Sequence, residues 1–157
     1  MGGSRYAARA VGMLLLAGAV LVLLSLTLPH PGGVDAQALA AIAAGMAIAG
    51  ALCFELCDRV PLWLTHATLA ATAVATCGLM WFSATAVGQF GTIFVWVVLV
   101  AAYYFPIRAT ATHLAWMLAV YGLTMAAIAD TGGYSPLTRW LFTGISLVVV
   151  ALITTAL

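Results

Sequence analysis

Long apolar runs separated by short breaks dominate the sequence, and they predict helices that cross a membrane. Apolar residues fill each run from end to end, whereas the core-facing stripe of a surface helix repeats with a period of 3.6. A helix needs about 20 mostly apolar residues to cross a bilayer, and the strict alternation of a membrane barrel strand is absent. We therefore predict an all-α membrane protein, a single-domain bundle of six transmembrane helices at about 8–28, 36–56, 62–82, 90–105, 109–128 and 137–157.

The breaks between the runs are rich in residues that end helices. The segment 29–33 reads Pro-His-Pro-Gly-Gly, and Asp35 follows it at a position suited to a helix N-cap. A second break, 105–108, joins two runs within the central stretch 94–121. In the second run, Gly45 and Ala49 are small residues four positions apart, which predicts close contact with a neighbouring helix.

Composition supports the membrane interpretation. Hydrophobic residues make up 66% of the chain and charged residues 6%, against about 25% charged residues in a soluble domain. All basic residues are arginines and they form no cluster, which argues against nucleic-acid binding. The three cysteines, Cys53, Cys57 and Cys77, lie in or beside apolar runs and are expected to pack as small hydrophobes without forming disulfides.

The arginines predict the orientation. Arg5, Arg9, Arg59 and Arg108 all fall on one side if the chain crosses six times, so the positive-inside rule places both termini in the cytoplasm. The N-terminal run is long enough to span, so it is interpreted as a helix and not as a signal peptide. We expect a multi-pass protein of the bacterial inner (plasma) membrane. Because the last run ends without interfacial anchors, we also expect cytoplasmic sequence after Leu157 and a longer parent chain.

Two histidines are candidates for chemistry. His66 and His113 lie at similar depths from the cytoplasmic ends of their helices, and Cys53 and Cys57 lie at that same end. One interpretation is a metal or haem site. The other, which we prefer, is that each imidazole bonds a neighbouring Ser, Thr or backbone group. No carboxylate or closely spaced histidine completes a ligand set, so neither metal nor cofactor is predicted.

Polar residues at the outer end form a second candidate set. Arg139 falls within a membrane helix, where an unpaired charge is costly, so Asp130 is its expected partner. Such a set suggests an outward pocket for a small anion or a lipid headgroup. Alternatively, and in preference, Arg139 snorkels to the interface beside Trp140. The full set is His30, Asp35, Gln89, Asp130, Tyr134 and Arg139.

Aromatic residues and threonines complete the candidates. The aromatic side chains either line an apolar cleft or pack helices together; they are Trp96, Tyr103, Tyr104, Trp116 and Tyr121. A row of threonines is interpreted as a helix contact, and it comprises Thr65, Thr68, Thr72 and Thr76. No catalytic motif is present, and the helix interiors carry no carboxylate, which argues against a transporter.

In the central stretch 94–121, a tryptophan in an apolar helix precedes an aromatic end, a basic turn and a helix with a leading histidine and a later tyrosine. The residues are Trp96, Ala102, Tyr103, Tyr104, Phe105, Arg108, His113 and Tyr121. This pattern resembles the membrane regions that precede GGDEF diguanylate cyclase domains in actinobacterial signalling proteins. The segments LPHPGGVD at 28–35 and RVPLWLTH at 59–66 also fit that pattern. The resemblance implies a dimeric six-helix sensory or anchoring module with an output enzyme after the last helix, and similar regions also precede adenylate cyclase or phosphodiesterase domains. These 157 residues contain no output sequence, so any catalysis would lie outside them.

We therefore predict a membrane module that dimerises, contacts lipid and regulates a cytoplasmic domain. An apolar or lipid-like small molecule is the expected ligand, and nucleic acid is not expected. Two alternatives stay open: a small haem- or metal-binding membrane protein that uses His66 and His113, and the membrane anchor of an adenylate cyclase. The residues expected to form a ligand pocket are Trp96, Tyr103, His113, Asp130 and Arg139.

Overall fold

The computed structural model describes residues 2–29, 33–83, 90–128 and 135–156, and these residues form six α-helices and no β-strand. The prediction of an all-helical chain is thus confirmed for the described residues. All the helix ends except one lie within two residues of the predicted positions. The helices are α1 Gly2–Thr27, α2 Ala36–Glu55, α3 Leu62–Phe82, α4 Gly91–Tyr104, α5 Ile107–Ala127 and α6 Pro136–Ala156.

Helix α1 begins at Gly2 and not at the predicted residue 8. The helix continues beyond the apolar run because its first turns still make contacts. Ala7 and Ala8 are buried, and the Arg5 side chain forms a salt bridge of 2.8 Å with Asp58 after α2. At the start of α2 the prediction is confirmed, since Asp35 is the N-cap and its carboxylate accepts a hydrogen bond of 3.0 Å from the Ala38 N–H.

Four of the described helices are long and apolar enough to cross a membrane, namely the segments Arg5–Thr27, Ala36–Glu55, Leu62–Phe82 and Pro136–Ala156. Helix α4 is apolar but has only 14 residues. Helix α5 has 21 residues, and its arginine, histidine and threonines lower its mean hydropathy. Length and composition therefore support a helical membrane bundle, with α4 and α5 as its less typical members.

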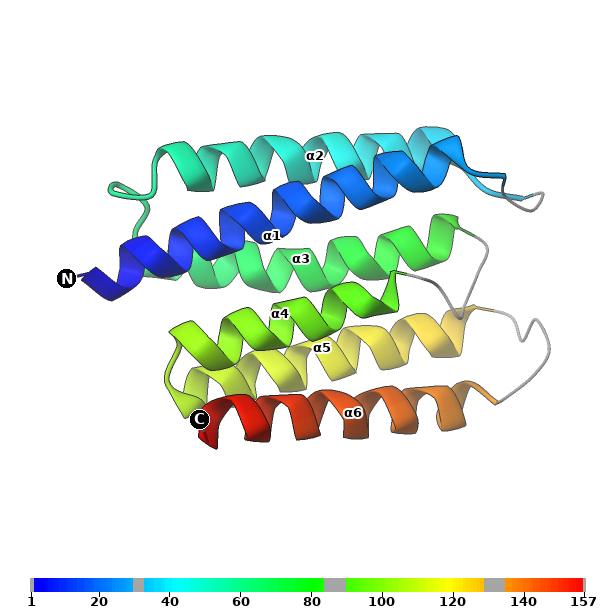
Figure 1. Ribbon diagram of the computed structural model, residues 1–157. Helices are drawn as coiled ribbons and strands as arrows, with labels where there is room; N and C mark the ends of the chain where they lie inside the picture. Colours follow the sequence, from blue (N-terminus) through cyan, green and yellow to red (C-terminus); the bar gives the residue numbers. More distant parts are fainter. Residues whose placement is uncertain (1, 30–32, 84–89, 129–134, 157) are drawn as a thin grey trace.

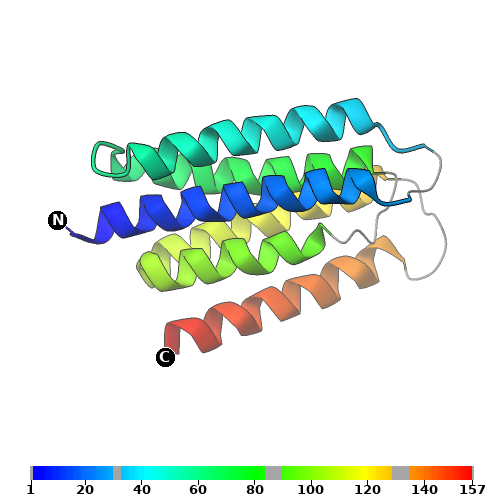
Figure 2. The same ribbon diagram turned by 45° about the horizontal axis from the view of Figure 1, so that its top comes forward.

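The helices lie side by side in one bundle, with α1 and α2 along one edge and α6 along the opposite edge (Figures 1 and 2). Helix α4 is central, because it contacts α1, α3, α5 and α6, whereas α6 contacts only α4 and α5 among the described helices. The start of α1 and the end of α6 lie at the same end of the bundle as the α2–α3 and α4–α5 turns (Figure 1). Helices α3 and α5 consequently run in the same direction.

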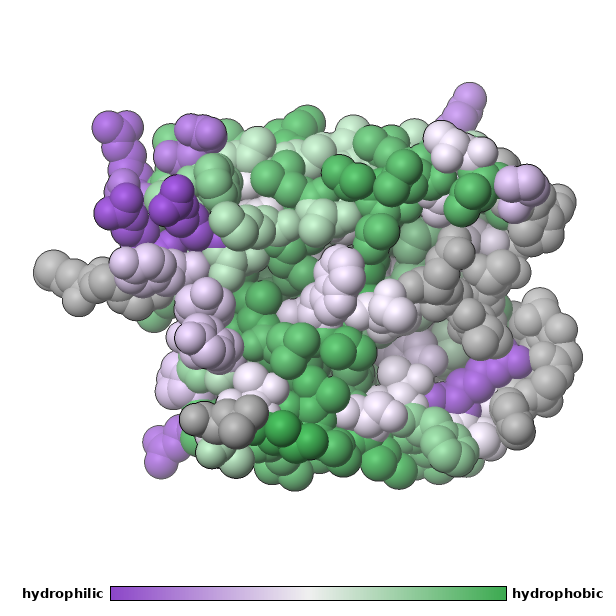
Figure 3. Space-filling model, in the orientation of Figure 1, coloured by the Kyte–Doolittle hydropathy of each residue, from purple (hydrophilic) through white to green (hydrophobic). Residues whose placement is uncertain are grey.

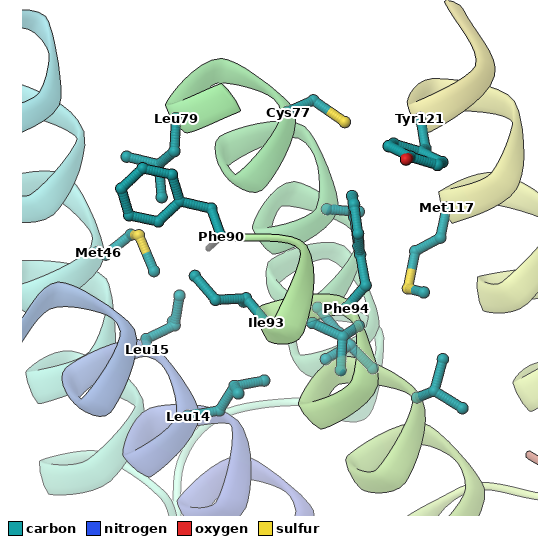
Figure 4. Packing of buried hydrophobic residues seen from close by; sticks show 14 of the residues in the cluster. Leu14, Leu15, Met46, Cys77, Leu79, Phe90, Ile93, Phe94, Met117 and Tyr121 are labelled. Atoms are coloured by element: carbon teal, nitrogen blue, oxygen red, sulfur yellow. The ribbon is translucent and has the colours of Figure 1, made fainter. Parts of the chain in front are cut away.

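The core is built around α4. Figure 4 shows Ile93 and Phe94 of α4 between side chains of α1, α2, α3 and α5. Phe94 is fully buried, and its ring packs edge-to-face with the Tyr121 ring, with 5.5 Å between the centroids. The buried hydrophobic residues around α4 thus connect both edges of the bundle through this one short helix.

The close helix contact predicted at Gly45 is wrong, because a Cβ atom at Gly45 would meet nothing within 4 Å. The contact lies at Gly50 instead. A Cβ atom at Gly50 would lie 2.9 Å from the Gly12 carbonyl oxygen, and one at Gly12 would lie 2.9 Å from the Gly50 carbonyl oxygen. The buried stripe of α2 explains the difference, since it comprises Leu39, Ala43, Met46, Gly50 and Cys53 and so leaves Gly45 on another face.

The surface is apolar over most of the bundle length. In Figure 3 hydrophilic residues gather at the end that holds the N-terminus, and hydrophobic residues cover much of the face beyond them. Large apolar side chains such as Leu123 and Phe142 are 72% and 71% exposed. A soluble monomer rarely exposes such extensive apolar surface, so this surface suits contact with lipid chains.

Candidate functional site

Two prolines determine where α3 and α5 begin. Pro61 and Pro106 are the residues before the first turns, with extended ψ values of 151° and 153°. Proline lacks the N–H that a helix interior needs, so it is well suited to these positions. Because both helices start at the same end of the bundle, His66 and His113 lie a similar distance along their helices.

His66 and His113 form a hydrogen bond with each other. The Nδ1 atom of His66 lies 2.9 Å from the Nε2 atom of His113, and the rings are nearly parallel, with an interplanar angle of 12° and centroids 5.2 Å apart. The expected Ser, Thr or backbone partners are therefore wrong. Phe105, at the end of α4, packs beside both rings, with its centroid 4.3 Å from that of His66 and 5.8 Å from that of His113.

A second bond joins α3 and α5 about one turn further along. The indole N–H of Trp116 donates to the carbonyl oxygen of Ala70 at 3.1 Å. Next to the histidines, the buried Thr110 hydroxyl donates to the Ala101 carbonyl oxygen of α4 at 2.9 Å. These bonds hold the first turns of α5 against both α3 and α4.

An open groove of about 470 Å³ runs beside the histidine pair. Alanines at three of its positions leave the space that larger side chains would fill. Sequence reasoning identified the histidines and Trp116 but missed these alanines. Ala70 and Ala109 lie four positions from a histidine and so share its side of the helix, and Ala67 is the residue after His66. The groove is lined by His66, Ala67, Ala70, Ala109, Thr112, His113 and Trp116.

Among the five residues expected to form a ligand pocket, only His113 lines this groove within the described part of the chain. Trp96 and Tyr103 lie on the outer face of α4, 37% and 75% exposed, and the Tyr103 ring packs on Tyr104. Arg139 is partly buried near the start of α6, at the other end of the bundle. Asp130 lies outside the described residues, so its pairing with Arg139 stays a prediction.

The remaining polar candidates of the outer end divide in the same way. Asp35 caps α2, while the other three lie outside the described residues and are His30, Gln89 and Tyr134. Trp140, next to Arg139, is turned toward α5, where its indole N–H donates to the Leu118 carbonyl oxygen at 2.8 Å.

The threonine row of α3 is buried in part and bonds mainly within its own helix, while Thr68 also interacts with the Cys53 thiol of α2. Thr68, Thr72 and Thr76 each donate to a carbonyl oxygen four residues earlier in α3, at 2.8–2.9 Å. Thr65 is fully buried, and its hydroxyl has no hydrogen-bond partner. The row therefore contributes packing and satisfies its hydroxyls locally, with Thr65 as the exception.

The histidine pair fits part of a metal site but not a haem site. Two nitrogens that bind one tetrahedral ion at 2.0–2.1 Å lie roughly 3.3 Å apart, which is close to the 2.9 Å found here. The described residues contain no group of three or more His, Cys, Asp or Glu suited to a metal, and Cys53, Cys57 and Cys77 are buried free thiols. A haem would need its ring plane between the imidazoles, where the direct bond leaves no room.

Comparisons of the chain with protein-family models, with curated proteins and with solved structures found no match.

Proposed function

We propose that the chain is a multi-pass sensory and anchoring module of a bacterial plasma membrane, which dimerises and regulates a cytoplasmic output domain of the GGDEF diguanylate cyclase type. The resemblance of the 94–121 stretch to such membrane regions supports the output class. The apolar bundle supports the membrane location. Because GGDEF domains work in pairs, the resemblance also supports a homodimer.

The arginines support cytoplasmic termini. Arg5 and Arg9 lie in the first turns of α1, Arg59 in the α2–α3 turn and Arg108 at the start of α5, and these segments share one end of the bundle (Figure 1). Under the positive-inside rule that end faces the cytoplasm. Green fluorescent protein fused to either terminus should fluoresce, while alkaline phosphatase fused there should be inactive. Termini on opposite faces would overturn this topology.

The observation that carries the sensory role is that α5 belongs to both the groove and the contact with α6. One side of α5 provides His113 and Trp116 to the groove. Another side packs on α6, where Trp140 donates to Leu118 and the Tyr121 and Thr143 hydroxyls lie 3.4 Å apart. A ligand that favours one position of α5 would therefore shift α6 as well, and it acts only if its affinity differs between the two positions.

The test is made on the full-length protein encoded by the gene. Cyclic di-GMP produced by that protein is measured in membranes, with and without His113→Leu, alongside Trp96→Phe as a variant on the lipid-facing side of α4. We expect His113→Leu to change the output at equal protein level and Trp96→Phe to leave it unchanged. A reading frame that encodes an adenylate cyclase would favour the anchor alternative, and one that encodes no output domain would overturn the proposal.

The 2.9 Å separation of the imidazole nitrogens also favours a second candidate, a small metal-binding membrane protein. In that case His66 and His113 would provide two ligands, and the others would come from solvent or from a second molecule. Elemental analysis of the purified protein tests this candidate. A stoichiometric metal that His66→Leu removes would support it, whereas a metal content unchanged by that substitution would overturn it.

A further inference from the structure

The bond between His66 and His113 leaves one nitrogen on each ring without a partner. It uses Nδ1 of His66 and Nε2 of His113, so Nε2 of His66 and Nδ1 of His113 remain. No further hydrogen bond engages either imidazole in the described part of the chain. Unlike the Thr65 hydroxyl, these two remaining nitrogens are not completely buried. The groove wall therefore offers hydrogen-bonding capacity that the protein does not use.

That capacity is always one donor and one acceptor while both rings are neutral. A neutral imidazole carries its proton on one nitrogen and a lone pair on the other. If His113 donates to His66, the free His66 nitrogen carries a proton and the free His113 nitrogen is bare. If His66 donates, the two roles exchange. Either way the pair presents one N–H and one bare nitrogen to a bound molecule.

The rest of the groove is apolar and aromatic. Its lining contains three alanines, the Trp116 indole and no Arg, Lys, Asp or Glu. The hydroxyl of Thr112, which also lines the groove, donates to the Arg108 carbonyl oxygen at 3.0 Å. A charged headgroup would find no counterion in such a site, whereas a flat uncharged ring could pack against the indole. The volume of about 470 Å³ lies within the range of small-molecule sites, roughly 300–1,000 Å³.

The depth of the groove suits a molecule that arrives through the bilayer. His66 is four residues and His113 six residues beyond the first residue of their helices, which places them about 6–9 Å along the helix axes. Trp63, at the start of α3, is 69% exposed, as is typical of an interfacial tryptophan. The groove thus lies where the polar ring of an otherwise apolar lipid-soluble molecule would lie.

We propose that the α3–α5 groove binds the ring of a lipid-soluble quinone or quinol, whose apolar tail extends into the bilayer. The imidazole N–H donates to a quinone carbonyl oxygen, and the bare imidazole nitrogen accepts from a quinol hydroxyl. The same pair therefore accommodates both oxidation states. This proposal rests on the proposed membrane location, and it deepens the sensory function by naming the ligand class.

A saturated acyl chain is the competing occupant of an apolar groove in a membrane. It could fill the space between the alanines, but it has no atom that pairs with either free ring nitrogen. The two occupants therefore differ in their dependence on the histidines. Binding of a quinone depends on them, and binding of an alkane does not.

The test uses the full chain in lipid nanodiscs, with decylubiquinone as the probe, decylbenzene as the apolar control and empty nanodiscs to correct for partitioning. Isothermal titration calorimetry should give saturable binding of decylubiquinone, weakened at least tenfold by His66→Leu and by His113→Leu. His113→Gln, whose amide keeps a donor and an acceptor, should retain part of the affinity and shows whether a loss reflects misfolding. Binding of both probes with equal affinity, or quinone binding unaffected by the histidine substitutions, would overturn the proposal.

The two tryptophans that donate across helices provide a matched pair of controls. Trp116→Phe removes the indole that lines the histidine groove, whereas Trp140→Phe removes the indole that bonds Leu118 on the other side of α5. We expect weaker quinone binding for Trp116→Phe and unchanged binding for Trp140→Phe. Equal effects of the two substitutions would contradict the assigned site.

The failure of this site and the failure of the sensory function give different results. If decylubiquinone binds through the histidines but leaves the cyclic di-GMP output of the full-length protein unchanged, the site stands and the sensory role is wrong. If decylubiquinone does not bind while His113→Leu still changes the output, the ligand class is wrong and the sensory role stands.

Discussion

His66 and His113 are 47 positions apart in the sequence, and their ring nitrogens lie 2.9 Å apart at the contact between α3 and α5. Phe105 packs beside both rings, and no other hydrogen bond engages either imidazole among the described residues. Each imidazole is therefore the principal polar partner of the other. This mutual dependence predicts how the two substitutions combine.

A double-mutant cycle of His66→Leu and His113→Leu should be non-additive. Each single substitution leaves the other imidazole without its partner, which costs about 1–3 kcal/mol, whereas the double substitution leaves no unpaired ring. We expect a coupling free energy of roughly 0.5–1.5 kcal/mol, typical of hydrogen bonds between membrane helices. Reversible unfolding in mixed detergent–SDS micelles measures it. Strictly additive effects would show that the bond contributes no stability.

Thr65 and Thr110 should respond in opposite ways to the same change. The Thr65 hydroxyl is buried without a partner, so Thr65→Val removes an unsatisfied group and should leave the free energy of unfolding unchanged or raise it. Thr110→Val loses the bond to the Ala101 carbonyl oxygen and should lower it by about 0.5–1.5 kcal/mol. Unfolding curves of the two variants decide this, and a loss at Thr65 as large as that at Thr110 would contradict it.

The elements were predictable because apolar runs and prolines mark them directly. Pro61 and Pro106 identify the starts of α3 and α5, and similar distances from those starts predict that His66 and His113 lie at a similar depth. Their mutual bond was not predictable, since it depends on how each helix is rotated about its axis. An all-apolar helix gives no indication of that rotation.

The same limit explains the candidates that lie elsewhere. Trp96 and Tyr103 share a face, as their spacing of seven predicts, but α4 is apolar all round and nothing in its sequence distinguishes core from lipid. The structure buries the opposite side, including Phe94 and Val98, so both aromatics face outward. The alanines of the groove were overlooked because a small residue becomes part of a site only when its neighbours leave it uncovered.

The salt bridge between Arg5 and Asp58 should contribute little to stability. Its atoms lie 2.8 Å apart, but the side chains are 52% and 63% exposed, so solvent screens the attraction. We expect Arg5→Gln to lower the free energy of unfolding by less than about 1 kcal/mol, with a smaller effect at high salt. Unfolding titrations at low and high sodium chloride test this. A loss that is large and independent of salt would indicate a further role for Arg5.

Two glycines of α2 should respond oppositely to alanine. In Gly50→Ala the new methyl group would lie 2.9 Å from the Gly12 carbonyl oxygen and 3.0 Å from Leu15 Cβ, so α1 and α2 must separate. Overpacking of this kind costs about 1–3 kcal/mol. In Gly45→Ala the methyl group meets nothing within 4 Å, and alanine favours the helix by up to about 1 kcal/mol. Unfolding in micelles should therefore give a lower free energy for Gly50→Ala than for the wild type, and an equal or higher one for Gly45→Ala. A Gly50→Ala variant as stable as the wild type would mean that α1 and α2 separate at Gly50 at no cost.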